Sequence, residues 1–310
     1  MSLVKRLKDA LISPEDMGNV TLNQFFDERV YPHILVKKKY PEHDRLTYDK
    51  HIRPKLGTVK LADITRIMVD DWMAAQIALG YKRSTVNKHV FLLNRIIKLA
   101  SHWGFISHSQ YSQLLLERLS LGDYKQHFLS QGELRRLLHA CDSDPHPYLG
   151  HFVRLLALTG ARNGEARQAK WSDFDLERGV WIVPKSKNGR SRRIILSQAA
   201  REVLDRTRET AREIGTGITE DDFVFTNPKT KTCYDSFYAA WHRARDAADL
   251  DTVRIHDLRH TFASLLINNG STIYDVQKLL GHHHISMTER YAHLLPDRLH
   301  GEVEKVSNFL

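Results

Sequence analysis

The sequence predicts a mainly α-helical protein with a small antiparallel β-sheet, arranged as an all-α N-terminal domain and a larger C-terminal domain. Apolar residues recur at helical spacing in both halves, whereas β-rich runs occur only in the second half. The 310 residues, 42% of them hydrophobic, suffice for one large domain or two ordinary ones. We place the boundary near Gly122, because the apolar residues around it have no long period.

Four segments follow from this boundary. We expect an N-terminal extension over residues 1–19 and a helical domain over 20–106. A linker over 107–126 then leads to the C-terminal domain and its tail, residues 127–310.

The N-terminal half contains the clearest helix signals. Thr21 and Gln24 form a capping-box pattern, and a second helix is expected between an N-cap at Ser84 and a stop at Gly104. The second helix has one apolar face, made of Val86, Val90, Leu93, Ile97 and Ala100.

Three basic residues, Lys88, Arg95 and Lys98, lie off that apolar face. Such charges usually form a solvated surface, but they also suit contacts to phosphates. The neighbouring run "LVKKKYPEHDRLTYDKHIRPK" is also rich in basic residues and favours phosphate contacts.

The second half contains the strand signals. Ser130 and Glu133 predict another capped helix start. Two β-rich runs then flank Asn188-Gly189, which predicts a hairpin, and "DDFVFTNP" predicts a third strand. Helices are expected in the rest of the chain, in "SFYAAWHRARDAA", "HDLRHTFASLLINNG" and "TIYDVQKLLG".

The composition limits the classes of function. The net charge of +9 and the pI near 9.4 favour a polyanionic partner such as nucleic acid, although a generic basic surface is equally compatible. No apolar run is long enough to cross a membrane, and the N-terminus does not resemble a signal peptide. Two isolated cysteines, Cys141 and Cys233, indicate a reducing compartment, so we expect a cytoplasmic protein.

Arg162 follows Thr159 and Gly160 at a predicted turn into a helix. The helix dipole disfavours an arginine there, unless an anion binds beside the free backbone N–H groups. Glu165 is close enough to hold Arg162 or to cap the helix. An ordinary surface ion pair has the same spacing, so both interpretations stay open.

His256, Arg259 and His260 share one face of the helix predicted in "HDLRHTFASLL". The zinc motif HExxH also has two histidines four residues apart, but it requires a glutamate where this chain has Asp257. Zinc is therefore a minor alternative, and we expect no metal site. We expect His260 to pack in the core with a hydrogen bond.

Three further residues stand at suggestive positions. Lys187 precedes the hairpin turn. A lysine at such a position is either a solvated surface charge or a side chain that the hairpin carries into a cleft. His282 follows Gly281, the expected end of a helix. A capping-box pattern at Ser286 and Glu289 predicts a short helix that carries Tyr291 toward His282.

The motifs "ALTGARNGEA", "HDLRHT", "LLGH" and "TERYAHL" occur in an order and at spacings that resemble those of the tyrosine recombinases, the phage-integrase family. This resemblance covers nearly all of the second domain, and the first domain is similar to the family's core DNA-binding domain. It implies a two-domain C-shaped clamp with an α+β catalytic domain. It also implies an active site of Arg162, Lys187, His256, Arg259, His282 and Tyr291, with Glu165 at the family's acidic position beside them.

The resemblance implies that Tyr291 attacks a DNA phosphodiester and forms a 3′-phosphotyrosine, with no ATP, metal or other cofactor. Arg162 and Arg259 would neutralise the phosphate, and His256 and His282 would donate hydrogen bonds to it. His256 would also take the tyrosine's proton, and Lys187 would protonate the leaving 5′-oxygen.

The expected partners are double-stranded DNA and three further copies of the chain, as a homo-tetramer on two paired sites, with accessory DNA-bending or directionality proteins. A nucleoid-associated integrase of a phage or other mobile element is the leading interpretation. A dimer resolvase or DNA invertase stays open, because we expect no arm-site DNA-binding domain before Val20. A type IB topoisomerase and a non-catalytic DNA-binding protein are weaker alternatives. An apolar stripe after Tyr291 is expected to dock on its own domain or on a neighbouring protomer.

Overall fold

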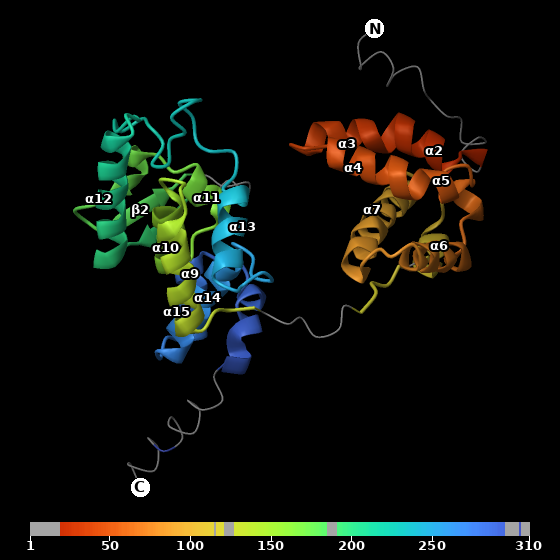
Figure 1. Cartoon of the computed structure of the whole chain (residues 1–310). Coiled ribbons are helices and arrows are strands. Elements are labelled where there is room, and N and C mark those ends of the chain that lie inside the picture. The colour runs from red at the N-terminus through yellow and green to blue at the C-terminus, as the bar shows by residue number, and fades with distance from the viewer. Residues whose placement is uncertain (1–18, 115, 121–126, 185–190, 295–303, 305–310) are drawn as a thin grey trace. The chain divides into compact units, whose positions relative to one another are not determined.

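The computed structural model describes residues 19–114, 116–120, 127–184, 191–294 and 304. The chain divides into two compact units, an N-terminal unit ending at Tyr124 and a C-terminal unit beginning at Lys125 (Figure 1). Helices dominate both units, and the described residues contain one small antiparallel sheet, as the sequence predicted. The finer division, with a linker over 107–126, stays a prediction.

The N-terminal unit is helical over its described residues. Two π-helical turns, Phe26–Val30 and Tyr48–Ile52, interrupt its first helices, and a 3-10 turn covers Leu61–Asp63. The α-helices are α2 (Leu22–Phe25), α3 (Tyr31–Lys37), α4 (Glu42–Thr47), α5 (Arg53–Leu56), α6 (Arg66–Ala78), α7 (Arg83–His102) and α8 (His108–Gln113).

The two π-helical turns pack against each other. The rings of Phe26 and Tyr48 stack with centroids 3.6 Å apart. Beside them, Asp27 accepts hydrogen bonds from Arg45 and Arg53, both at 2.7 Å, and Asp49 also accepts from both arginines. A stacked aromatic pair and a four-residue ionic network therefore join the first two helical segments.

The ends of the N-terminal helices test the predicted caps. The capping box of Thr21 and Gln24 is confirmed, and Gly104 (φ 82°) ends α7 as predicted. The prediction of Ser84 as an N-cap is wrong, because Lys82 already has extended backbone and α7 begins at Arg83. The predicted apolar face of α7 is confirmed, since all five of its residues are buried: Val86, Val90, Leu93, Ile97 and Ala100.

The first part of the predicted linker packs with the N-terminal unit. Leu114 and Leu116 are buried in its core, and the side chain of Asn87 bonds both the backbone N–H and the carbonyl of Leu119. The chain thus stays attached to α7 until shortly before the unit ends.

The C-terminal unit carries a three-stranded antiparallel sheet with strand order β1-β2-β3. Strand β2 pairs with β3 from Val180 opposite Ile195 to Val183 opposite Arg192. The strands are β1 (Phe174–Asp175), β2 (Val180–Val183) and β3 (Arg192–Ile195). The antiparallel β2–β3 pairing agrees with the predicted hairpin, although its Asn188-Gly189 turn lies outside the described residues.

The strand predicted in "DDFVFTNP" is wrong. Phe223 and Thr226 form only single bridges, to Lys170 and Cys233. Neighbouring Val224 and Phe225 are both fully buried, so this run lacks the alternation of a half-buried strand. Strand β1 completes the sheet instead.

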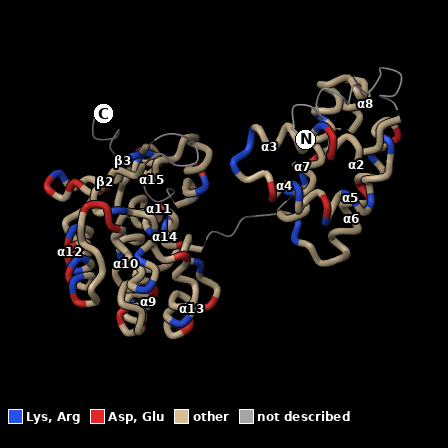
Figure 2. Tube along the Cα trace, turned by 90° about the horizontal axis from the view of Figure 1, so that it is seen from above, with Lys and Arg blue, Asp and Glu red and all other residues tan. Residues whose placement is uncertain are grey.

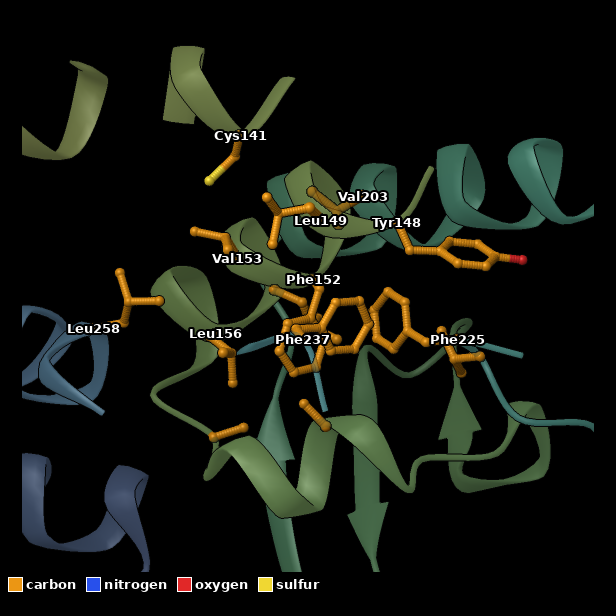
Figure 3. Close-up of a cluster of buried hydrophobic side chains, with 14 of the residues drawn as sticks. Cys141, Tyr148, Leu149, Phe152, Val153, Leu156, Val203, Phe225, Phe237 and Leu258 are labelled. Carbon is orange, nitrogen blue, oxygen red and sulfur yellow. The ribbon is translucent and has the colours of Figure 1, made fainter. Parts of the chain in front are cut away.

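Helix α10 lies at the centre of the C-terminal unit and packs against α9, α12 and α14 (Figure 1). The ring of Phe152 on α10 stacks on Phe237 with centroids 4.0 Å apart, inside the buried cluster of Figure 3. The helices of this unit are α9 (Gln131–Ser143), α10 (Leu149–Thr159), α11 (Asn163–Arg167), α12 (Gln198–Glu213), α13 (Tyr238–Ala247), α14 (Asp257–Asn268) and α15 (Ile273–Leu280). The predicted capping box of Ser130 and Glu133 begins α9.

Three short 3-10 turns complete the unit, at Trp171–Asp173, Ile285–Met287 and Glu289–Leu294. None of the described helices in either unit combines the length and apolar character that a membrane span requires.

We expect Phe152→Ala to lower the free energy of unfolding of the C-terminal unit by about 3–5 kcal/mol, because it removes a stacked ring from a fully buried cluster. Urea denaturation of the full chain, followed by tryptophan fluorescence, measures this loss. Tyr238→Ala is the control, since that ring is 68% exposed, and its effect should stay within about 0.5 kcal/mol. Equal losses in the two variants would contradict the assigned core.

Candidate active site

Arg162 is positioned by the turn that connects α10 to α11. Gly160 ends α10 in the left-handed conformation (φ 60°), and Arg162 is the N-cap of α11, as predicted. A Cβ atom on Gly160 would lie 2.5 Å from the Phe262 ring and 2.9 Å from Leu280. Both the backbone conformation and the close packing therefore require glycine at this position.

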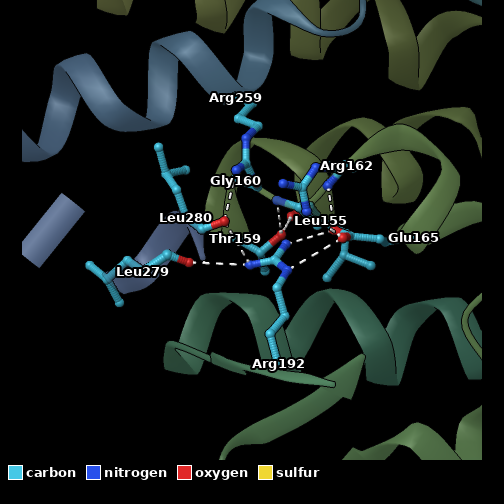
Figure 4. A network of polar contacts seen from close by, with 10 residues as sticks. Leu155, Thr159, Gly160, Arg162, Glu165, Arg192, Arg259, Leu279 and Leu280 are labelled. Atoms are coloured by element: carbon cyan, nitrogen blue, oxygen red, sulfur yellow. Dashed lines mark hydrogen bonds and ion pairs between the residues drawn. The ribbon is translucent and has the colours of Figure 1, made fainter. Parts of the chain in front are cut away.

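The carboxylate of Glu165 holds Arg162 and caps α11 at the same time. Its oxygens accept from the backbone N–H of Arg162 at 2.9 Å and from its guanidinium at 2.8 Å. Arg192 donates to the same carboxylate at 2.6 Å (Figure 4). Burial raises the pKa of Glu165, but the hydrogen bonds and charges of Arg192 and Arg162 outweigh burial and lower it to about 2.

Arg192 is a residue that the sequence analysis missed. It donates to Glu165 and to the backbone carbonyls of Leu279 and Leu280, at 3.4 and 3.1 Å, which connects strand β3 to the end of α15. Its side chain is only 14% exposed and lies on the same face of β3 as the buried Ile194. An arginine in phase with a core residue of a strand is the signal that could have identified it.

Arg259 is buried, with two of its N–H groups bound to backbone oxygens. Its terminal nitrogens donate to the carbonyl of Gly160 at 2.5 Å and to that of Leu280 at 2.7 Å. Burial and the positive charges of Arg162 and Arg192 lower the pKa of Arg259 to about 9. Two of the three guanidinium groups thus bind one carboxylate, and the third, Arg259, shares the Leu280 carbonyl with Arg192 (Figure 4). An anion would stabilise this group of positive charges.

His282 stands directly after α15. Gly281 ends this helix with a left-handed backbone (φ 65°), as predicted. The Nδ1 atom of His282 lies 2.8 Å from the hydroxyl of Thr288. Burial and the charges of Arg259 and Arg162 lower the pKa of His282 to about 3, so its ring is neutral near pH 7.

The segment that carries Tyr291 differs from the prediction of a capped helix at Ser286. Ser286 lies inside the 3-10 turn Ile285–Met287, and the backbone N–H of Tyr291 bonds Thr288 three residues earlier. The chain therefore forms successive 3-10 turns, and the Thr288 hydroxyl binds His282.

The hydroxyl of Tyr291 lies 2.6 Å from Nδ1 of His260, and both residues are buried. The predicted burial and hydrogen bonding of His260 are thereby confirmed. His256 precedes α14, and its ring meets that of His260 edge-on with centroids 5.3 Å apart. Burial and the charge of Arg259 lower the pKa of His256. Helix α14 thus carries both Arg259 and His260, the residue that contacts the tyrosine.

The phage integrase family model matches residues 127–298, more than half of the chain and including the site above. The chain belongs to the phage integrase family. It is a site-specific recombinase of the tyrosine type, which confirms the resemblance seen in the motifs.

Similar proteins include integrases of mobile elements. The ICEBs1 integrase of Bacillus subtilis is 25% identical over 294 residues, which cover 88% of this chain and 79% of that protein. The Tn1549 transposon integrase, solved in complex with transposon right end DNA, matches 93% of this chain and 100% of that chain, with a TM-score of 0.75 at 18% identity. A lambda integrase tetramer bound to a Holliday junction matches 88% of this chain and 77% of that chain, with a TM-score of 0.68 at 22% identity.

Of the six catalytic residues predicted for this integrase-family chain, the structure describes five. Arg192 links Arg162 and Arg259, because it shares Glu165 with the first and the Leu280 carbonyl with the second. The charges of both arginines act on His282, and His256 and Tyr291 flank His260. The sixth, Lys187, lies outside the described residues. Within the described parts of both units, no group of three or more His, Cys, Asp or Glu side chains could hold a metal ion.

The predicted DNA-contact residues lie on α7 of the N-terminal unit. Lys88 and Lys98 are exposed, whereas Arg95 donates to Asp44 on α4 at 3.2 Å. Lys88 and Arg95 line a hollow of about 420 Å³ between α4 and α7. Helix α7 has basic residues and no acidic ones, in contrast to α12, where both signs alternate (Figure 2).

We expect Glu165→Gln to destabilise the C-terminal unit at pH 7 by an amount on the order of 3 kcal/mol, because it removes the anion between Arg162 and Arg192. The contribution of Glu165 is present above its ordinary pKa of 4.5 and is lost as the pH falls through about 2. The difference in unfolding free energy between wild type and variant should therefore shrink between pH 4.5 and 2. Urea titrations across this range measure it.

Glu202→Gln, at an exposed position of α12, is the control and should leave the pH profile unchanged. A Glu165→Gln deficit that stays constant down to pH 2 would show that the loss has another origin.

Proposed function

We propose that this recombinase is the integrase of a phage or other mobile element, and that it cuts and rejoins DNA through a 3′-phosphotyrosine link to Tyr291. The observation that carries the proposal is the grouping of Arg162, Arg192 and Arg259, which Glu165 and the Leu280 carbonyl join together, with His282 in the field of their charges. These residues form a preorganised site for one phosphate diester. Tyr291 packs beside α14, where its hydroxyl contacts His260.

Arg162 and Arg259 bind the non-bridging oxygens of the scissile phosphate. Arg162 is 37% exposed and keeps donors beyond the one that it gives to Glu165. Arg259 gives one N–H group of each terminal nitrogen to a carbonyl, so its remaining N–H groups serve the phosphate. Each positioned charge lowers the barrier by about 3–4 kcal/mol where negative charge develops.

His282 and His256 complete the set of donors. Nδ1 of His282 lies 2.8 Å from the Thr288 hydroxyl. In the tautomer that we assign, this hydroxyl donates to Nδ1, and the ring proton is on Nε2, the atom that bonds the phosphate. Thr288 is therefore a positioning residue for the His282 tautomer. His256, the N-cap residue of α14, lies in the field of Arg259 and supplies the second imidazole donor.

Lys187 protonates the 5′-oxygen as it leaves. An alkoxide is a far stronger base than a phenolate, so strand cleavage needs an acid at this oxygen. Lys187 precedes the predicted hairpin turn between β2 and β3, and β3 contributes Arg192 to the site.

DNA is the substrate, and α7 supplies further contacts to its backbone. The net charge of +9 and the exposed Lys88 and Lys98 suit phosphate neutralisation. We assign the active assembly as a homo-tetramer on two paired sites, working in the cytoplasm at the nucleoid with accessory DNA-bending or directionality proteins. The lambda integrase tetramer on a Holliday junction supports this assembly. A dimer resolvase or invertase is the alternative, and recombination of two separate DNA molecules distinguishes an integrase from both.

We expect Tyr291→Phe to abolish the covalent protein–DNA adduct while DNA binding is retained, because only the attacking oxygen is lost. A nicked half-site substrate that traps the adduct, resolved on a denaturing gel, measures cleavage, and a gel-shift assay measures binding. Tyr274→Phe, which changes a 58% exposed tyrosine, is the control and should form the adduct normally. A denaturation-resistant adduct in Tyr291→Phe would assign the nucleophile to another residue.

We expect Lys187→Ala to slow cleavage of ordinary DNA by about 100-fold or more, as loss of a general acid does. DNA with a bridging sulfur at the 5′ position should restore the rate, because a thiolate leaves without a proton. Single-turnover cleavage of the two substrates measures the rescue. An equal deficit on both substrates would remove Lys187 from the acid role.

A further inference from the structure

Tyr291 is held in place by an apolar cluster and by one imidazole. The cluster comprises Ala263, Ile267, Val276 and Leu280, from helices α14 and α15. The tyrosine is 1% exposed, and its hydroxyl reaches Nδ1 of His260 at 2.6 Å. His260, on α14, is itself 4% exposed. The nucleophile of the proposed reaction is therefore in direct contact with a histidine that lies outside the predicted catalytic set.

We propose that His260 is a catalytic residue that accepts the phenolic proton of Tyr291 as the tyrosine attacks the phosphate. This inference rests on the proposed function, and it moves the role of proton acceptor from His256 to His260. The geometry required for a general base is already present, because heavy-atom distances of about 2.6–3.2 Å are those of a proton transfer along a hydrogen bond.

The step balances in atoms and charge. The neutral His260 ring, protonated at Nε2, takes the Tyr291 proton through the Nδ1 lone pair and becomes an imidazolium. The phenolic oxygen forms its bond to phosphorus while the bond from phosphorus to the 5′-oxygen breaks, and the leaving oxygen takes a proton from Lys187. In religation, the same imidazolium returns its proton to the tyrosine, so one residue serves both directions.

The surroundings keep His260 neutral before attack. Burial lowers its pKa to about 4, aided by neighbouring His256, while Asp257 acts in the opposite direction. Arg254, which precedes α14, and Arg290, from the turn of Tyr291, lower the pKa further. The lone pair that must receive the proton is therefore available at pH 7.

His256 is placed for a different task. Burial lowers the pKa of His256 most, and the charges of Arg259 and Arg162 lower it further, so its ring lies in the field of the arginines that we assign to the phosphate. Its ring contacts that of His260 edge-on, at a centroid distance of 5.3 Å. The two histidines of "HDLRH" thus have different roles: His256 donates a hydrogen bond to the phosphate, and His260 accepts the proton of the nucleophile.

The test is the rate of covalent adduct formation by the full chain on a nicked half-site, measured in single turnover from pH 6 to 9. We expect His260→Asn to bind DNA normally and to cleave about 100-fold more slowly than wild type at pH 7, the smaller end of the range for loss of a general base. The deficit should narrow by about tenfold per pH unit as hydroxide replaces the missing base. Fluorinated tyrosine at position 291, whose phenol is more acidic, should also reduce the difference in cleavage rate between wild type and His260→Asn.

His151→Asn is the matched control, because it removes another partly buried histidine that bonds a threonine hydroxyl on α12. It should cleave at the wild-type rate. His260→Gln, whose longer amide also cannot accept a proton, should share the pH-dependent deficit and guards against a folding defect in one variant.

Three results would overturn the proposal. A rate equal to wild type in both His260 variants would show that another base acts, and a faster rate would make His260 a restraint on the tyrosine. A deficit that is the same at every pH would show that the residue only positions Tyr291. Failure of the proposed function gives a different result, because wild-type protein would then form no adduct at all.

Discussion

The catalytic half of this recombinase depends on one carboxylate. Glu165 accepts hydrogen bonds from Arg162 and Arg192, which come from the start of α11 and from strand β3. The three arginines of the site would repel one another if that anion were absent. Since a buried ion pair is expensive to form and expensive to break, the network fixes its members more than it stabilises the fold as a whole. The network therefore fixes the geometry of the arginines that we assign to the phosphate.

Different forces position Tyr291, the proposed nucleophile. Apolar packing against α14 and α15 holds the Tyr291 ring, and the hydrogen bond with His260 orients its hydroxyl. Helix α14 contributes a residue to each of these two groups. Arg259 lies among the arginines that we assign to the phosphate, and His260 contacts the tyrosine. In the proposed reaction, the spacing of these neighbouring residues on one helix sets the position of the attacking tyrosine relative to the phosphate.

Much of this site could be predicted from the sequence, for identifiable reasons. Glycines in the left-handed conformation mark the helix ends that precede Arg162 and His282, and short-range caps such as Glu165 act within one helical turn. Arg192 was missed because its partners lie 27 and 88 positions away in the chain, a distance at which local patterns carry no information. The turn of Tyr291 was predicted as a capped helix because Ser286 and Glu289 have the right spacing, but Thr288 forms the decisive contact instead. The false strand at Val224 and Phe225 has a similar origin, since local β propensity was overridden by burial on both sides.

The carbonyl of Leu280 accepts hydrogen bonds from both Arg192 and Arg259. It lies at the C-terminal end of α15, where the helix dipole carries partial negative charge. This helix end places partial negative charge beside the guanidinium groups of Arg192 and Arg259, in addition to the carboxylate of Glu165 that binds Arg192. In the proposed reaction, this partial negative charge lowers the affinity of the site for a ground-state phosphate. The additional negative charge that develops in the transition state is still attracted by the arginines. A moderate affinity for the phosphate favours product release, because a site that bound every phosphate tightly would retain the rejoined DNA.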